Sequence, residues 1–296
     1  MRALSFGVLA QEAILGSWPA SVIGVTSGGV FIISKNQRVL FLTYSPFHSP
    51  STINLEHNLV DLRQNENGAK VSLARDQIRF PDTGLAVDLE GALVWMAEPP
   101  GSLSETQHSG ISERLRRAVR NAAEQKGAQG LAPVLGWLVG QGEAEMTGDM
   151  TEKVFAGLID MRIAINSWNL AGFFQAAGQI IGHGRGLTPA ADDCIAGVIL
   201  TLNRWGAQMK YYFDPHVLNA GILELARAKT TSLSVTIIEA AVMGQGDERI
   251  LRVLDGIMDG NYNESVAIQN LVRMGHSSGV DTLAGITLVL TAGQLP

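Results

Sequence analysis

The first hundred residues contain short runs of β-branched and aromatic residues separated by turn-forming residues. The first three runs are SVIGV, GVFIIS and RVLFLTY, with Ser27-Gly28-Gly29 and Lys35-Asn36-Gln37 between them. Four more follow, TINLE, AKVSL, DQIRF and GLAVDLEGALVWMA. Hydrophobic runs of this length bounded by turn residues predict strands and hairpins. At least six strands without intervening helices favour an antiparallel β barrel or sandwich over a parallel sheet.

The period of the apolar positions changes after the run Glu98-Pro99-Pro100-Gly101-Ser102, and TQHSG extends this break as a polar linker. ISERLRRAVRNAAEQK then has helical spacing, with Ser112 as N-cap and Gly127 as its stop. Apolar helical stretches continue to the end of the chain, about eight in number, with a Gly-rich connection at 147–149. The fold class predicted is therefore α+β, with a β-rich domain over residues 1–100 and an all-α domain over residues 111–296.

Composition excludes several classes of protein. Of the 296 residues, 46% are hydrophobic and 17% are charged, which is incompatible with intrinsic disorder. The formal net charge is −6 and no basic block occurs, so nucleic acid is not an expected partner. One cysteine, Cys194, excludes a disulfide framework. The apolar stretches are too short to span a bilayer, and the N-terminal segment makes a poor signal peptide, so we expect a cytoplasmic protein with no membrane partner.

The segment IGHGRGLTPAADDCIAGVIL at 181–200 is the most unusual in the chain. Its alternating glycines permit positive φ and close approach of a ligand to the backbone. Thr188 is a good N-cap and Pro189 suits the first helical position, so a helix is predicted to begin there. A glycine loop that leads into a helix N-terminus is an anion site, to which Arg185 can add a bidentate contact.

Asp192 and Asp193 follow in the first turn of that helix. One of them can simply complement the helix dipole. Neighbouring residues point about 100° apart on a helix, so the other can face a substrate amine or Mg²⁺. Ligation of a metal stays open.

The segment Met274 to Ile286 repeats this arrangement, with a Gly/Ser loop opening a helix. Aligned on Asp193 and Asp281, the two segments share the pattern D-x-[IL]-A-G-[VI]-x-L. The shared small residues would let two helices approach closely. We therefore expect both loops to meet, although chance repetition in a Gly/Ala-rich chain is the alternative.

Three smaller features complete the candidate site. The hydroxyl-rich run TTSLS at 230–234 either caps the next helix or contributes to the same polar region. His183 and His276 lie inside the two glycine loops, where each can either contact a ligand or have a structural role. Cys194 begins an apolar helical run and is expected to be a buried small hydrophobe rather than a nucleophile.

These motifs resemble those of a bacterial family known mainly as a domain of unknown function. Its hallmarks are G-x-G-x-G-L-T-P-[S/A]-G-D-D, T-T-x-x-S and G-H-S-S-G-x-D-x-L-x-G. The chain has GHGRGLTPAADD at 182–193, TTSLS at 230–234 and GHSSGVDTLAG at 275–285, in the same order. Ala191 stands where the family usually has Gly.

The family includes one subunit of a three-component oxamate (oxalurate) carbamoyltransferase of purine catabolism and allantoin degradation. The resemblance implies a subunit of such an enzyme, with other subunits as partners and with oxamate or oxalurate and phosphate or carbamoyl phosphate as substrates. The alternatives are a Mg²⁺-dependent hydrolase or phosphotransferase that uses the paired aspartates, and a non-catalytic anion-binding scaffold. The candidate catalytic residues are Asp192, Asp193 and Asp281, and the candidate substrate-binding residues are Gly182, His183, Gly184, Arg185, Gly186, Thr188, Thr231, Ser234, His276, Ser277 and Ser278.

Overall fold

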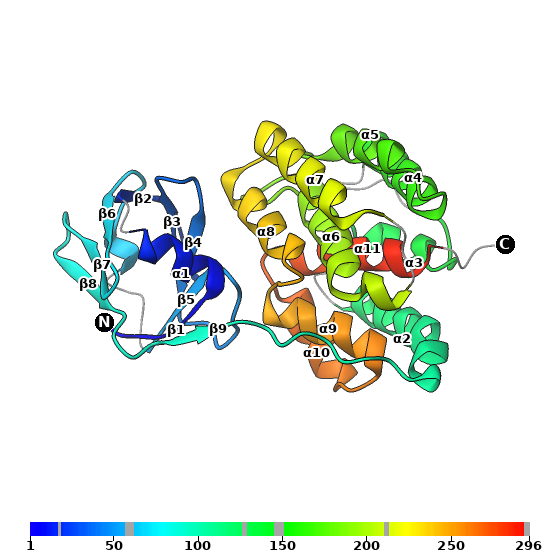
Figure 1. Cartoon of the computed structure of the whole chain (residues 1–296), viewed down its shortest axis with the longest axis horizontal. Helices are drawn as coiled ribbons and strands as arrows, with labels where there is room; N and C mark the ends of the chain where they lie inside the picture. Colours follow the sequence, from blue (N-terminus) through cyan, green and yellow to red (C-terminus); the bar gives the residue numbers. More distant parts are fainter. Residues whose placement is uncertain (17–18, 57–61, 126–128, 145–150, 210–212, 293–296) are drawn as a thin grey trace. The chain divides into compact units, whose positions relative to one another are not determined.

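The chain folds into two compact units, Met1–Glu98 and Pro99–Pro296. The structure is a computed structural model, and it describes the chain apart from residues 17–18, 57–61, 126–128, 145–150, 210–212 and 293–296 (Figure 1). The gaps include Gly127 and the Gly-rich connection at 147–149, which therefore lie outside the described residues.

The N-terminal unit is built on one curled nine-stranded sheet with the strand order β8-β7-β6-β2-β3-β4-β5-β1-β9 (Figure 1). All pairings are antiparallel except β4 with β5 and β1 with β9. An isolated bridge between Arg2 and Asp88 brings the start of β1 to the end of β8. The predicted class is confirmed, with a single curled sheet in place of two packed ones. The strands are β1 Ala3–Gly7, β2 Pro19–Thr26, β3 Gly29–Ser34, β4 Val39–Thr43, β5 Thr52–Leu55, β6 Lys70–Leu73, β7 Gln77–Phe80, β8 Leu85–Asp88 and β9 Leu93–Trp95.

The expectation that no helix interrupts the strands is wrong at the N-terminus. Helix α1, Val8–Leu15, lies between β1 and β2. The first turn of α1 is capped from a distance, because Leu9 and Ala10 both donate their N–H to the carbonyl of Pro50. Gly7 permits this contact, since a Cβ there would lie 2.1 Å from the carbonyl oxygen of Ser49. No local sequence pattern predicts such a cap, because the acceptor is about 40 residues away in the chain.

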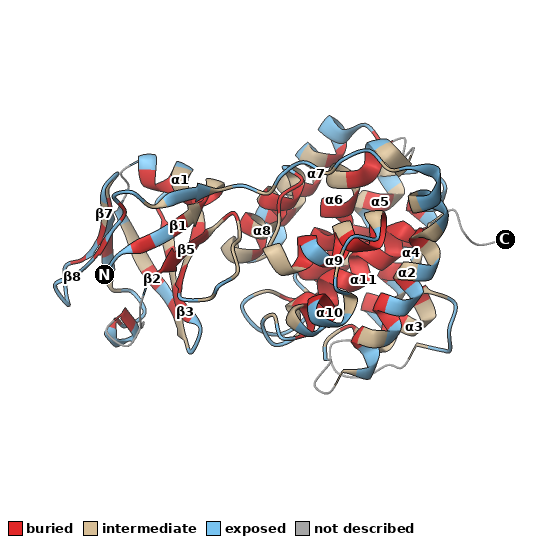
Figure 2. Cartoon of the chain, turned by 90° about the horizontal axis from the view of Figure 1, so that it is seen from below, coloured by how far each residue is buried: buried red, intermediate tan, exposed pale blue. Residues whose placement is uncertain are grey.

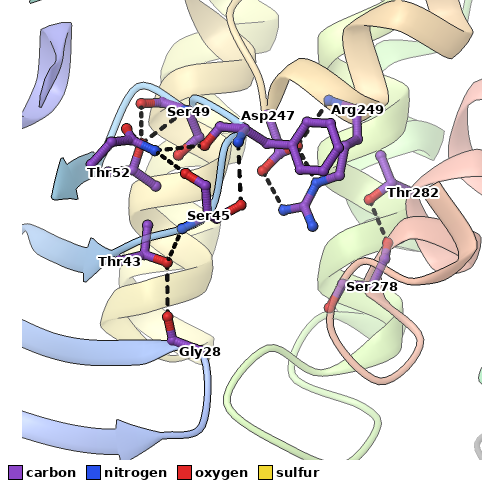
Figure 3. A network of polar contacts seen from close by, with 11 residues as sticks. Gly28, Thr43, Ser45, Ser49, Thr52, Asp247, Arg249, Ser278 and Thr282 are labelled. Carbon is purple, nitrogen blue, oxygen red and sulfur yellow. Dashed lines mark hydrogen bonds and ion pairs between the residues drawn. The ribbon is translucent and has the colours of Figure 1, made fainter. Parts of the chain in front are cut away.

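Apolar side chains from the strands and from α1 form one core inside the curled sheet, including Val30, Ile32, Leu40, Leu42 and Phe80. Successive side chains point to opposite faces of a strand. In β6 and β7, every second residue is therefore buried. The end of β4 is fixed by the hydroxyl of Thr43, which donates to the carbonyl of Gly28 at 2.8 Å and accepts from the N–H of Ser45 (Figure 3).

The described residues of the second unit form ten α-helices and no strand, two helices more than the sequence predicts. Helices α6 and α11 are buried along most of their length, and the other helices surround them (Figure 2). No helix among the described residues is long and apolar enough to cross a membrane. The helices are α2 Glu105–Glu124, α3 Ala132–Leu138, α4 Glu152–Asn166, α5 Leu170–Ile180, α6 Ala190–Met209, α7 Pro215–Lys229, α8 Ser232–Val242, α9 Glu248–Asp259, α10 Glu264–Val272 and α11 Ser278–Leu290.

The start of α2 corrects the predicted linker. The segment TQHSG at 106–110 is helical, and the N-cap is Ser104 rather than Ser112. Ser104 and Gln107 form a capping box, in which each side chain bonds the backbone N–H of the other residue. The Gln107 side chain also donates to the carbonyl of Asp259 at the end of α9. This tertiary contact stabilises a first turn whose composition is polar.

Candidate functional site

Helices α6 and α11 pack closely because each carries glycine at the point of contact. A Cβ on Gly197 would lie 2.2 Å from the carbonyl oxygen of Thr282. A Cβ on Gly285 would lie 1.9 Å from the carbonyl oxygen of Cys194. Both glycines belong to the repeated D-x-[IL]-A-G pattern, so the expected close approach of the two helices is present. Their first turns, which carry the two loops, are therefore held near each other.

The first glycine loop requires glycine for two different reasons. Gly182, Gly184 and Gly186 all have positive φ, at 81°, 127° and 93°, which side chains rarely tolerate. At Gly184 a Cβ would also lie 2.3 Å from the backbone nitrogen of Ala190, so the loop folds directly against the start of α6. The alternating glycines thus produce a tight loop, as the sequence predicts.

Thr188 does not take the capping role that the sequence predicts for it. Helix α6 begins at Ala190, and the Thr188 hydroxyl donates to Asp193 Oδ2 at 2.9 Å. The N–H of Ala191 donates to the carbonyl of His183, and the N–H groups of Asp192 and Asp193 donate to the carbonyl of Pro189. Most of the N–H groups that open this helix are therefore occupied, and an anion would have to use the amides of the loop itself.

Asp192 joins the first loop to the turn between α7 and α8. Its carboxylate accepts from the N–H of Gly182 at 2.6 Å and from the Thr230 hydroxyl. The side chain is buried, with 2% of its surface exposed. A buried carboxylate that accepts hydrogen bonds from two segments holds those segments in place.

Asp193 and Ser278 connect the first loop to the second. The carboxyl group of Asp193 accepts from the hydroxyls of Thr188 and Ser278. The Thr188 and Ser278 hydroxyl oxygens lie 3.2 Å apart across 90 residues of sequence. Burial raises the pKa of Asp193 well above its usual range, the charges of Asp281 and Asp192 add to this, and the two hydroxyl donors oppose it. The two loops meet, as the repeat predicts.

Asp281 accepts a hydrogen bond from a distant segment that the sequence does not connect with it. Its Oδ1 accepts from the N–H of Leu131 at 2.6 Å, at the start of α3. Gly130 precedes it with φ 61°, and a Cβ there would lie 2.2 Å from the same oxygen. Asp281 therefore attaches the segment before α3 to the first turn of α11. No residue pattern could reveal this contact, because the donor is a backbone amide.

The TTSLS run joins the first loop through a hydroxyl. Thr231 caps α8 by accepting from the N–H of Ser234 at 3.1 Å, which is the simpler of the two predicted roles. The Thr231 hydroxyl also lies within 3.0 Å of the carbonyl oxygen of Leu187, to which it can donate. Ser234 is buried. The structure thus brings together all three motifs, and the hydroxyl-rich run contacts the glycine loop through Thr231 and Leu187.

The exposed part of this cluster consists of Gly182 and residues 184–187 on the first loop, Thr231 in the hydroxyl-rich run, and Gly275 and His276 on the second loop. Ser277 and Ser278 are half-buried, and the backbone of Ser278 accepts from the Thr282 hydroxyl at 2.8 Å (Figure 3). Solvent or a ligand can reach these residues.

His183 is held at both ring nitrogens, by the carbonyl of Ile180 at 2.9 Å and by Lys153 Nζ at 3.0 Å. A ring protonated on Nδ1 donates to that carbonyl and leaves Nε2 to accept from the lysine. Lys153 lies on α4 and was not among the residues singled out from the sequence, since its position near the loop depends on helix packing. It adds a positive charge next to the glycine loop.

The three aspartates do not make up a group that could hold a metal ion by itself. They are 2%, 2% and 0% exposed, and their oxygens bond to different segments of the chain. Among the described residues there is no group of three or more His, Cys, Asp or Glu side chains that could hold a metal ion. Burial also raises the pKa of the Cys194 thiol, which is fully buried and remains protonated. Its expected role as a small core residue agrees with this position.

Residues 180–290 match the protein family described as oxamate carbamoyltransferase subunit AllH. The matched region runs from the end of α5 to the end of α11 and contains all three motifs. The match supports membership of the chain in this family and confirms the resemblance that the motifs indicate. No solved structure matches the chain.

Proposed function

From the match to the oxamate carbamoyltransferase subunit family, we propose that the chain is a cytoplasmic subunit of a carbamoyltransferase of purine catabolism, in allantoin degradation. The substrates are oxamate or oxalurate and phosphate or carbamoyl phosphate. The observation that supports this most directly is the convergence of the three motifs within the matched region, where Thr188 and Ser278 lie 3.2 Å apart.

The exposed loop residues contact the substrate in this proposal. The backbone amides at 184–188 and the Arg185 guanidinium bind phosphate or carboxylate oxygens. The exposed His276 and half-buried Ser277 and Ser278 face the same substrate from the second loop. Lys153, which bonds His183 beside the loop, adds positive charge and favours an anionic ligand.

The aspartates act as positioning residues rather than as groups that touch the substrate. Asp192, Asp193 and Asp281 are buried, and each accepts a hydrogen bond that fixes a loop or a neighbouring segment. Transfer of a carbamoyl group then depends on placing the two reactants and stabilising the charge that develops between them. This reading needs no covalent nucleophile.

The binding of substrate is tested by calorimetric titration of phosphate, carbamoyl phosphate and oxamate into the wild type and into Arg185→Ala. A charge-assisted hydrogen bond contributes about 1.5–3 kcal/mol, so the variant should bind at least about tenfold more weakly. The matched control is Arg252→Ala, which removes an exposed arginine that pairs with Glu248 on α9. Equal affinity in the wild type and Arg185→Ala would place the anion elsewhere.

A non-catalytic anion-binding scaffold is the second candidate, and the burial of all three aspartates favours it. Carbamoyl transfer measured with the other subunits present separates the two functions. For an enzyme subunit, Arg185→Ala lowers the turnover of the reconstituted complex at saturating substrate or raises its KM. For a scaffold, assembly is retained and both kinetic constants remain at the wild-type value.

A further inference from the structure

A second cationic site lies on the helical unit, away from the glycine loops. A cavity of about 50 Å³ is lined by Ser112, Leu115 and Arg116 of α2, Leu138 of α3, Arg162 of α4 and Thr291 after α11. A single water needs roughly 10–15 Å³ of cavity volume, so this cavity has room for an ion about the size of acetate or phosphate. Thr291 follows the last residue of α11 and is ten residues from Asp281, or about 15 Å along the helix axis, so the cavity is separate from the loops.

Arg162 is the unusual residue in this cavity. Its side chain is buried, with 8% of the residue exposed, and its Nε has no hydrogen-bond partner among the described residues. Buried charges in proteins are ordinarily paired and hydrogen-bonded. The guanidinium carbon lies 5.4 Å from the centre of the Trp137 ring, which stabilises the cation from one side but satisfies none of its N–H groups.

The surroundings of Arg162 contain no described carboxylate that pairs with it. Burial alone lowers its pKa, with no acidic side chain acting in the opposite direction. An arginine keeps its charge under these conditions, because its ordinary pKa lies far above neutral pH. The guanidinium therefore presents a charge and an unbonded donor to a cavity that is large enough to hold an acceptor.

The balance of charge around the cavity is positive. The C-terminal ends of α3 and α11 both lie here, and each carries roughly half a negative charge from its helix dipole. Arg116 and Arg162 together carry two positive charges, which exceed this sum. Ser112, Thr291, Leu115 and Leu138 also line the cavity, and the Thr291 hydroxyl donates to the carbonyl of Thr287 at 2.8 Å.

We infer that this cavity, lined by Arg116 and Arg162, binds a small oxyanion of the carboxylate or phosphate class. Arg162 provides the buried bidentate contact and Arg116 a second, exposed one. This site is independent of the substrate site proposed at the glycine loops.

Calorimetric titration tests the inference in the Arg185→Ala chain, in which the loop site is weakened. Sodium acetate and sodium phosphate are titrated separately at constant ionic strength. We expect saturable binding of at least one of them, and binding of only one identifies the class. Arg162→Met should weaken it at least about tenfold, and Arg116→Met by a smaller factor. The matched control is Arg120→Met, which removes an exposed arginine of α2 that does not line the cavity and should change nothing.

The exposed Arg116→Met variant keeps the test decisive if Arg162→Met does not fold. An anomalous difference map from crystals soaked in selenate gives a second measurement, with a peak expected between Arg116 and Arg162. The inference is overturned if neither anion binds, or if the Arg116 and Arg120 variants bind with the affinity of the parent chain. Arg162 would then be a structural residue that the Trp137 ring and the two helix ends stabilise.

Discussion

Gly197 and Gly285 occupy equivalent positions on two packed helices, and each lies against the carbonyl of the residue three positions before the other. Gly197 approaches Thr282, and Gly285 approaches Cys194. The two repeats are offset by 88 residues, so Gly197 corresponds to Gly285 and Cys194 corresponds to Thr282. The two contacts are therefore equivalent. The two helices are therefore related by an approximate twofold exchange at their crossing, and the contact resembles the self-complementary interface of a dimer within one chain.

This relationship predicts that alanine is poorly tolerated at either glycine. Gly197→Ala and Gly285→Ala each place a methyl group within about 2 Å of backbone, which must shift. Overpacking of a core typically costs about 1–3 kcal/mol and occasionally more, so each variant should lower the free energy of unfolding by at least this amount. Urea unfolding followed by circular dichroism measures the effect.

Gly206→Ala is the matched control, because Gly206 lies on the same helix and no atom lies within 4 Å of its added Cβ. Alanine is favoured over glycine in a helix by roughly 1 kcal/mol, so this variant should be neutral or stabilised. A loss of stability at Gly206 as large as at Gly197 would show that the helix crossing is not the cause.

The glycine loop allows strain and steric contact to be separated. Gly184 and Gly186 both have positive φ, but only Gly184 would place a Cβ against backbone, 2.3 Å from the Ala190 nitrogen. Gly186→Ala should cost about 1–2 kcal/mol through backbone conformation alone, and Gly184→Ala should cost clearly more. Equal losses in thermal unfolding would mean that the loop can move away from α6.

The buried carboxyl of Asp193 gives stability a particular dependence on pH. Its pKa is raised in the folded chain, whereas an unfolded Asp titrates near pH 3.9. Between that pH and the raised pKa, the folded chain keeps a proton that the unfolded chain has lost. The free energy of unfolding therefore falls as pH rises toward and through the raised pKa. Asp193→Asn cannot titrate and should lack this fall, which makes it relatively more stable at pH 8 than at pH 4.5.

Unfolding in urea at several pH values checks the Asp193 prediction. The asparagine retains an oxygen that can accept from Thr188 and Ser278, so the hydrogen bonds are largely preserved. Asp160→Asn on α4 is the control, because this carboxylate is exposed. Parallel stability curves for Asp193→Asn and the wild type would contradict the raised pKa.

Asp192 and Thr230 should be coupled energetically. Asp192→Ala removes the acceptor of both the Gly182 N–H and the Thr230 hydroxyl, and an unsatisfied polar group costs about 1–3 kcal/mol. Once Asp192 is absent, Thr230→Val should cost little more, so the two losses should not add. A double-mutant cycle measures this, and strictly additive losses would rule out the shared contact.

The sequence predicts elements better than it predicts their ends. All seven apolar runs of the first hundred residues contain strands, because turn residues bound them. The prediction fails at α1, because its short apolar stretch is as compatible with a strand as with a helix. It also fails at the start of α2, where the contact between Gln107 and Asp259 decides the boundary.

The same distinction holds for the candidate site. The repeated D-x-[IL]-A-G pattern correctly predicts that the two loops meet, because glycines at equivalent positions imply a helix crossing. It does not reveal Leu131 or Lys153. The first contributes only a backbone amide, and the second reaches His183 through the packing of α4. The sequence also leaves the burial of Asp192 and Asp193 open, since carboxylates at a helix start are usually exposed.

The position of β1 in the sheet has a consequence for synthesis on the ribosome. This strand is made first, yet it lies between β5 and β9, which follow it by about 50 and 90 residues. At roughly 5–20 residues per second, several seconds pass before both neighbours exist. During that interval the backbone of β1 has no completed ladder, so pairing of this strand should be a late event in the folding of the N-terminal unit, and the nascent chain is exposed to chaperones until residue 95 emerges.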